Sequence, residues 1–301
     1  VHHMSLVINH NMMALNASRN LNESYGRLAT STRRLSSGLR VGTAADDAAG
    51  LAIRELMRAD ISTMRQGVRN ANDAISMIQT ADGALQIIDE KLIRMKELAE
   101  QAATGTYNSD QRLMIESEYQ AMASEITRIA NATDFNGIHL LDGTLSGTHN
   151  GSGLRQTGEL KIHFGTGNDS NEDYYYIKIG GATASQLGIG NASATGAAAG
   201  GYTISTQSAA QNALTALDQA IISKDKIRAA LGALQNRLEN TISNLTIQAE
   251  NLQSSESRIS DVDVAEEMTE FVRNQILTQS AVAMLSQANS LPQMAMKLIG
   301  G

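Results

Sequence analysis

"RRLSSGLRVGTAADDAAGLAI", residues 33–53, joins two segments of helical periodicity and carries no recognisable catalytic pattern. Gly38 and Gly42 are residues that commonly end a helix, because glycine adopts the left-handed backbone conformation without a steric penalty. Asp46 and Asp47 suit the start of the next helix, where carboxylates accept hydrogen bonds from free backbone N–H groups. We therefore predict that this stretch is a joint between two helical rods.

Helical periodicity continues on both sides of the joint. Before it, apolar or tolerated residues recur at steps of about four and three from Leu21 to Leu39, which places them on one stripe of a helix. After it, a seam runs from Met57 to Ala102, a length of ~70 Å at 1.5 Å per residue that is typical of a coiled-coil-like rod. Further helices are expected after an N-cap at Ser109 or Asp110, from near Ser208, and from Val262 or Asp263, with Pro292 disturbing the final turns.

The composition changes between about residues 137 and 206, where glycine is frequent. Residues 160–164 and 174–179 each alternate in polarity, and the turn-rich "GTGNDSNED" separates them, so we predict a hairpin of two short strands. The following "GATASQLGIGNASATGAAAGG" is predicted to form a loop.

The order of these elements predicts a mainly α fold. It consists of long antiparallel coiled-coil-like helical rods from both termini and a small central β-hairpin region at about residues 137–206. Residues 4–45 and 258–301 form the predicted terminal coiled-coil domain, which is discontinuous. Residues 46–257 form the predicted helical rod domain.

The charges of the two chain ends are opposite. Residues 4–42 carry a formal charge of +4, from five Arg and one Glu, and residues 256–301 one of −3, from three basic and six acidic residues. The two ends are therefore predicted to attract each other.

The composition also excludes several classes of protein. Aromatic residues make up 3% of the chain and Trp is absent, which favours thin apolar seams between helices over a compact core. The chain has no Cys, so disulfides and thiolate metal sites are impossible. The net charge of −7 argues against nucleic acid as a partner, and no membrane span is expected because no run of about 18 apolar residues exists.

No arrangement for catalysis, cofactor binding or metal binding is recognised. The patterns H-E-x-x-H, G-x-S-x-G and G-x-x-x-x-G-K-[ST] are absent. His2, His3 and His10 are interpreted as tag or surface histidines, and "DSNEDY" from Asp169 lacks the Gly and Glu that a calcium loop requires. The chain is therefore not expected to be an enzyme, and we expect no cofactor.

The stretch "LSSGLRVGTAADDAAGLAI" closely resembles the signature of bacterial flagellin, and so do "NDAISMIQTADGAL", "ATDFNGIHLL" and "SRISDVDVAEEMTEFVRNQIL". The resemblance covers nearly all of residues 5–299 and is weakest from about 143 to 206, where many flagellins carry outer domains. It implies a short flagellin with core domains and little or no outer insertion. It also implies a subunit that is secreted by type III export and polymerises into the extracellular flagellar filament for motility.

The resemblance also implies partners. These are copies of the same chain in a helical homopolymer, a flagellar export chaperone, the filament cap and hook–filament junction proteins, and host Toll-like receptor 5. The terminal domain would line the filament interior, and its helices are expected to become ordered only against neighbouring subunits. The predicted self-assembly seam consists of Leu21, Tyr25, Leu28, Leu35, Leu39, Val264, Met268, Phe271, Val272 and Ile276.

By resemblance, the receptor-binding residues are Arg94, Leu98, Gln101 and Glu118. The first three are spaced four and three apart, so they are expected to share a helix face away from the apolar seam. Two other functions stay open. A hook–filament junction protein has similar terminal heptads, and a secreted helical adhesin would fail to polymerise.

Overall fold

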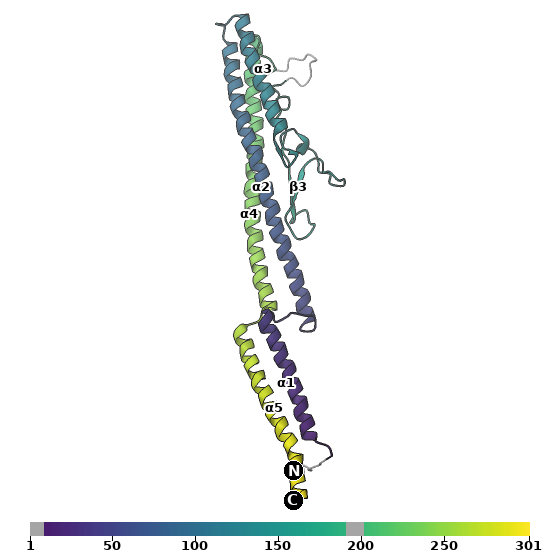
Figure 1. Ribbon diagram of the computed structural model, residues 1–301. Coiled ribbons are helices and arrows are strands. Elements are labelled where there is room, and N and C mark those ends of the chain that lie inside the picture. Colours follow the sequence, from purple (N-terminus) through teal and green to yellow (C-terminus); the bar gives the residue numbers. More distant parts are fainter. Residues whose placement is uncertain (1–8, 191–201) are drawn as a thin grey trace. The chain divides into compact units, whose positions relative to one another are not determined.

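The computed structural model describes residues 9–190 and 202–301 (Figure 1). His2 and His3 lie outside the described residues, as does the second half of the predicted glycine-rich loop. The helices are α1 Met12–Ser37, α2 Ala48–Ala103, α3 Ser109–Ala132, α4 Gln207–Ser260 and α5 Val264–Gly300. The short elements are β1 Asp134–Phe135, β2 Ile138–His139, 3-10 helix η1 Thr144–Ser146, β3 Leu160–His163 and β4 Tyr174–Ile177. The predicted mainly α fold with a small central hairpin region is confirmed.

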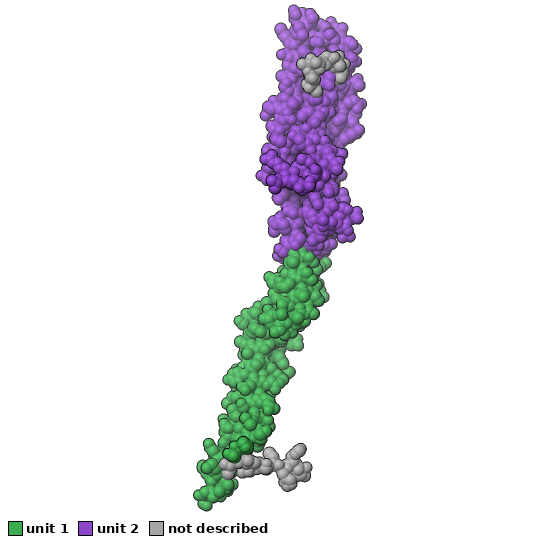
Figure 2. Space-filling model, turned by 90° about the vertical axis from the view of Figure 1, so that its right-hand side faces the viewer, with its two compact units in different colours: residues 1–61, 250–301 green, residues 62–249 purple. Residues whose placement is uncertain are grey.

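The chain divides into two compact units, coloured separately in Figure 2. Unit 1 comprises residues 1–61 and 250–301, so it combines both chain ends, and unit 2 comprises residues 62–249. The sequence predicts domain boundaries near residues 45 and 258, where the joint connects the two rods. These boundaries remain a prediction. Across the described residues, none of the helices combines the length and apolar character that a bilayer crossing requires.

The core of unit 2 is built on the long seam of α2. Ile78, Leu85, Ile88 and Leu92 from this seam are all fully buried in one apolar cluster with residues of α3, α4 and both hairpins. The three helices run alongside one another in this unit (Figure 1). Unit 2 therefore has a continuous core of large aliphatic side chains, as the periodicity predicts.

Ion pairs show the register of α2 against α4. Arg228 Nε lies 2.8 Å from Asp82 Oδ1, and Lys96 Nζ lies 2.5 Å from Asp218 Oδ1. Between these pairs, the buried Lys224 contacts Asp89. As the residue number rises on α2 it falls on α4, so the two helices are antiparallel.

The β3–β4 hairpin is the one predicted from alternating polarity. Its antiparallel register pairs Leu160 with Ile177 and His163 with Tyr174. The β1–β2 hairpin was not predicted, although Asn136 and Gly137 form its turn with positive φ angles of 53° and 78°. Asn-Gly is the strongest short signal for such a turn, but the two strands are too short to show alternation.

The helix ends follow local capping chemistry. Gly38 ends α1 in the left-handed conformation, with φ of 73°, as predicted. The N-cap of α3 lies before the expected positions, because Asn108 accepts from the N–H of Gln111 while the Gln111 side chain accepts from the N–H of Asn108. This reciprocal capping box makes Asn108 the N-cap instead of Ser109 or Asp110.

Helix α5 continues through Pro292 to Gly300, whereas the sequence predicted a disturbance there. A proline has no N–H, so Pro292 cannot donate to the carbonyl oxygen of Ala288, four residues earlier. The side chain of Asn11 donates to this oxygen instead, with Nδ2 at 2.9 Å. Ala288 and Ala295 on either side are buried, which also holds the helix on α1.

Candidate assembly surface and joint

Helix α5 turns small and polar side chains toward α1. Both helices belong to unit 1 and pack side by side. The buried residues of α5 are Glu267, Asn274, Thr278, Ala288 and Ala295. The pair is therefore joined along a narrow seam with few large side chains.

Two buried polar contacts define the register of α1 on α5. Asn274 Nδ2 donates to Ser31 Oγ at 3.4 Å, and Arg34 Nη1 lies 3.8 Å from Glu267 Oε2. The other oxygen of Glu267 is buried without a hydrogen-bond partner. Such groups lower stability but favour one register, because a shifted pairing would leave more of them unsatisfied. Sequence reasoning missed these residues, and the signal was polar side chains at buried heptad spacing.

The predicted attraction between the chain ends is realised only weakly within the described residues. Arg34 and Glu267 form the ion pair between α1 and α5. Arg27 instead pairs with Glu23 in its own helix, and Arg273 pairs with Glu270. Exposed pairs within a helix contribute little, so charge alone does not hold α1 on α5.

Most large apolar side chains of α5 are exposed, whereas Phe271, Leu285 and Leu291 are half-buried. Those exposed are Val264, Met268, Val272, Ile276, Leu277, Val282, Met284, Met294, Met296, Leu298 and Ile299. They are distributed around the helix, which has almost no amphipathic character. Large apolar side chains exposed on several sides of a helix are normally covered by a partner, so α5 lacks part of its cover in the isolated chain.

The ten predicted seam residues divide into two groups. Leu21, Leu28, Leu35, Leu39 and Phe271 are half-buried, whereas Tyr25, Val264, Met268, Val272 and Ile276 are exposed. On α1, the face turned to α5 passes through Ser24 and Leu28, so the neighbouring Tyr25 points outward and is 55% exposed. The exposed residues of α5 lie beside its buried face, not on it.

A groove runs between α1 and α5, with a volume of about 530 Å³. Its lining includes Met13, Ala17 and Ser24 from α1 and Ser280, Ala281 and Met284 from α5. Its wall combines small side chains and a methionine from each helix with polar side chains of α1 that include Glu23 and Arg27. The groove has the character of a hole that receives a bulky side chain from another helix.

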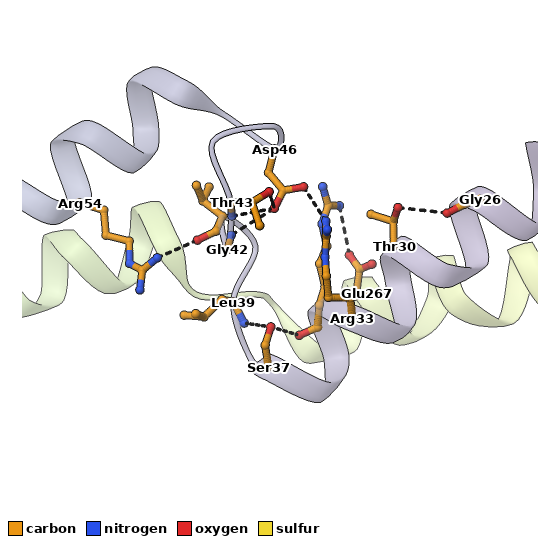
Figure 3. A network of polar contacts seen from close by, with 12 residues as sticks. Gly26, Thr30, Arg33, Ser37, Leu39, Gly42, Thr43, Asp46, Arg54 and Glu267 are labelled. Atoms are coloured by element: carbon orange, nitrogen blue, oxygen red, sulfur yellow. Dashed lines mark hydrogen bonds and ion pairs between the residues drawn. The ribbon is translucent and has the colours of Figure 1, made fainter.

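Asp46 organises the joint that the sequence singled out (Figure 3). Its Oδ2 accepts from the backbone N–H groups of Gly42 and Thr43, each at 3.2 Å, and Arg33 Nη2 donates to its Oδ1 at 2.6 Å. Asp46 thus closes the loop, and Asp47 alone caps α2, by accepting from the Gly50 N–H at 3.0 Å. The prediction of a helix start is right for Asp47 and wrong for Asp46.

The environment of Asp46 shifts its pKa. Desolvation in the loop raises this pKa, but the N–H donors of Gly42 and Thr43 and the guanidinium of Arg33 outweigh it. The pKa of Asp46 is therefore held below its usual range, and the carboxylate is the stable form.

The joint is also bound to the connection between α4 and α5. The N–H of Arg40 donates to the carbonyl of Ser260 at 2.6 Å, and the N–H of Val262 donates to that of Gly38 at 3.1 Å. The buried Arg54 donates to the Val41 carbonyl at 3.0 Å. The joint is therefore a folded connection within unit 1, and sequence reasoning had no signal for the role of Arg54.

The residues predicted to bind a receptor lie on α2 and α3 in unit 2. Arg94 Nε donates to Glu118 Oε1 at 3.0 Å, and both side chains are exposed. Hydrogen bonds to Glu118 and Glu97 raise the pKa of Arg94. Gln101 is half-buried and its Nε2 donates to the Tyr107 hydroxyl at 3.1 Å.

Leu98 does not share this exposed face. Its side chain is 1% exposed and belongs to the core of unit 2. The expectation failed because α2 packs against both α3 and α4, so its buried stripe is wider than a single seam and includes Leu98 together with Met95 and Ala102.

These features define a class of protein. The described parts of the chain hold no cluster of three or more side chains suited to metal binding. Instead, the chain ends present apolar helices that are covered on one face only. The fold and the exposed apolar side chains on its end helices are those of a helical structural protein.

Comparisons with known proteins identify the family. The sequence pattern of the bacterial flagellin N-terminal helical region matches residues 8–146, and that of the C-terminal helical region matches residues 214–299. Flagellin FlaB2 of Treponema pallidum is 40% identical over 294 residues, with 98% of this chain and 100% of the relative covered. The flagellar filament 33 kDa core protein of Treponema phagedenis is 39% identical over 300 residues, with 98% and 100% covered. The chain therefore belongs to the bacterial flagellin family.

A solved structure described as a flagellar hook-associated protein of Vibrio parahaemolyticus is also similar. It has a TM-score of 0.53 and 15% identity, with 72% of this chain and 100% of that chain covered. At this identity the likeness shows the fold alone. As a flagellin, the chain is a structural subunit of the flagellar filament, which is exported outside the cell and serves motility.

Proposed function

We propose that the exposed apolar side chains of α5 and the α1·α5 groove form the contacts between neighbouring subunits of the filament. The observation that carries this proposal is that large apolar side chains are exposed on several sides of α5, whereas α1 covers only one face of it. In the filament, copies of the same chain would supply the missing cover. The half-buried seam residues of α1 would then complete their burial in the same contacts.

The proposal extends to the organisation of the chain. Residues 4–45 and 258–301 form the terminal domain and line the filament interior, and residues 46–257 form the rod domain. Family membership supports these assignments, and the filament core protein of Treponema phagedenis is a relative over its whole length. The same membership supports an export chaperone, the filament cap and hook–filament junction proteins as partners.

The assembly contacts can be tested at Ile276, which is 57% exposed. Ile276→Asp should raise the critical concentration for polymerisation by roughly tenfold or more, because a buried carboxylate without a partner is costly. Ile276→Leu keeps the apolar side chain and should polymerise as the parent chain does. Sedimentation of filaments grown on flagellar seeds measures both. Normal polymerisation of Ile276→Asp would refute this surface.

We further propose that the monomer is a ligand of Toll-like receptor 5, through the surface around Arg94, Gln101 and Glu118. An exposed Arg held in place by two carboxylates is a suitable interface anchor. The buried Leu98 would not contact the receptor, but it would support this surface by packing beneath it in the core.

A receptor reporter assay with monomeric protein tests this second function. Arg94→Asp places a third carboxylate beside Glu97 and Glu118 and should lower the potency by about tenfold or more. Arg128→Asp is the matched control, since Arg128 is also an exposed Arg paired with a carboxylate, Glu125. Full potency of Arg94→Asp, or equal losses in both variants, would contradict the assignment.

A further inference from the structure

The methionines of the two end helices differ in exposure from those of the core. Every methionine of α1 and α5 is exposed, with fractions from 44% to 61%, namely Met12, Met13, Met268, Met284, Met294 and Met296. In unit 2, Met77 and Met95 are fully buried in the apolar core. Exposed methionines are therefore concentrated on α1 and α5, the helices assigned above to assembly, and Met114 of α3 in unit 2 is exposed as well.

We propose that these methionines are modification sites whose oxidation to the sulfoxide blocks assembly. This inference rests on the proposed assembly contacts and adds a regulation to them. The oxidant is a peroxide. The thioether sulfur attacks one oxygen of hydrogen peroxide, a sulfur–oxygen bond forms, the oxygen–oxygen bond breaks, and water leaves after proton transfer. The sulfur is oxidised by two electrons and the peroxide is reduced by two.

The effect on assembly follows from the change in polarity. Methionine is unbranched and polarizable, so it fills irregular gaps between packed helices. The sulfoxide is polar, and its burial without a hydrogen-bond donor is unfavourable. Met13 and Met284 line the α1·α5 groove, so their oxidation places polar oxygens where a side chain of another copy would pack.

Whether a subunit is oxidised depends on whether it has already joined the filament. An unassembled subunit exposes these sulfurs, whereas contact with neighbouring copies covers them. Oxidation therefore acts on free subunits much faster than on those already in the filament. A damaged subunit is excluded from growth, and the existing filament is spared.

The experiment compares the parent chain with two variants. In the first, Met268, Met284, Met294 and Met296 are all replaced by Leu; in the second, Met114→Leu removes an exposed methionine of α3 in unit 2. Each monomer is treated with hydrogen peroxide, its sulfoxides are located by peptide mass spectrometry, and its critical concentration is compared with that of its untreated form.

Oxidation should raise the critical concentration of the parent chain and of Met114→Leu by about tenfold or more. The fourfold Leu variant should change much less, and methionine sulfoxide reductases should restore assembly of the parent chain. Normal assembly of a parent chain with oxidised α5 methionines would overturn this inference alone. Failure of every untreated chain to polymerise would overturn the assembly contacts themselves and, with them, this inference.

Discussion

Asp46 is the side chain on which the polar contacts of the joint converge. Only 10% of its side chain is exposed, and it accepts from two backbone N–H groups and from Arg33. Replacement of this carboxylate leaves loop N–H groups without a strong acceptor. The backbone bonds to Ser260 and the Arg54 contact hold the joint around Arg40 and Val41, whereas Asp46 binds the N–H groups of Gly42 and Thr43.

The pH dependence of the joint follows from the direction of the Asp46 pKa shift. Because this pKa is lower in the folded joint than in the unfolded chain, the stabilisation is fully present above the unfolded value of about 3.9. It is lost as the pH falls through the lower folded value. Asp46→Asn should therefore destabilise filaments by about 1–2 kcal/mol per subunit at pH 7 and make their dissociation depend less on pH below about 4.

The measurement is the midpoint temperature of filament dissociation, followed by light scattering between pH 7 and pH 3. Asp60→Asn is the matched control, since Asp60 is an exposed carboxylate of α2 within the same unit. Identical pH profiles for Asp46→Asn and the parent chain would show that Asp46 does not carry the acid sensitivity of the joint.

At the scale of a helix, the Asn11 side chain contacts both α1 and α5. Asn11 caps α1 by accepting from the Ala14 N–H at 2.9 Å, and it donates to the carbonyl that Pro292 leaves free in α5. The proline thereby costs α5 less than it would in an isolated helix, where it is unfavourable by about 3 kcal/mol relative to Ala.

This double role predicts a coupling between Asn11 and Pro292. Asn11→Asp keeps the capping oxygen but loses the donor, so it should destabilise filaments by about 1–2 kcal/mol per subunit. In a Pro292→Ala background, the alanine introduced there has an N–H that satisfies the carbonyl of Ala288, and the cost should fall by about 1 kcal/mol. A double-mutant cycle on dissociation midpoints measures the difference. Equal costs in both backgrounds would mean that Asn11 does not compensate for the proline.

The elements differ in how far the sequence could predict them. The α2 seam and the β3–β4 hairpin have long, regular patterns, and both were predicted correctly. The end of α1 at Gly38 was predicted because its backbone conformation specifically favours glycine. The continuation of α5 through Pro292 could not be predicted, because it depends on a donor from a residue far away in the chain.

At the candidate sites too, periodicity predicts which residues are neighbours but not which other elements cover them. The spacing of Arg94, Leu98 and Gln101 correctly indicates neighbouring positions on a helix, but it does not reveal how many partners cover that helix. Leu98 is buried because α3 and α4 both pack on α2. Tyr25 shows the opposite error, since one helix partner covers a narrower stripe than the periodicity of α1 suggests.

Close packing within unit 2 adds a further constraint that periodicity cannot show. At Gly67 of α2, a Cβ atom would lie 2.0 Å from the Phe164 carbonyl oxygen, so the backbone after β3 approaches the helix directly. Asn70 secures the same approach by donating to the His163 carbonyl at 2.8 Å. The hairpin is therefore held on α2 by residue types that a pattern of apolar positions passes over.

At the scale of the whole chain, the two units differ in how many large apolar side chains they bury. Unit 2 buries large aliphatic side chains in one continuous cluster. In unit 1, α5 fully buries only Glu267, Asn274, Thr278, Ala288 and Ala295, and it leaves most of its large apolar residues exposed. Regions with few buried apolar contacts open at low free energy, so the α1·α5 pair should open well before unit 2 does.

Limited proteolysis can therefore distinguish the free subunit from the filament. In the monomer, trypsin should cleave first at Arg27 and Arg273, which lie on α1 and α5, and leave a resistant fragment from unit 2. In the filament, the proposed contacts with neighbouring copies would cover these helices. Cleavage at the same sites should then slow by about tenfold or more, since each 1.4 kcal/mol of added stability changes the open population tenfold. Arg128 in unit 2 is the internal control, because its cleavage depends on unit 2, which stays folded in both states. Equal cleavage rates at Arg273 in monomer and filament would mean that α5 gains no cover on assembly, and the role of its exposed apolar residues would have to be sought elsewhere.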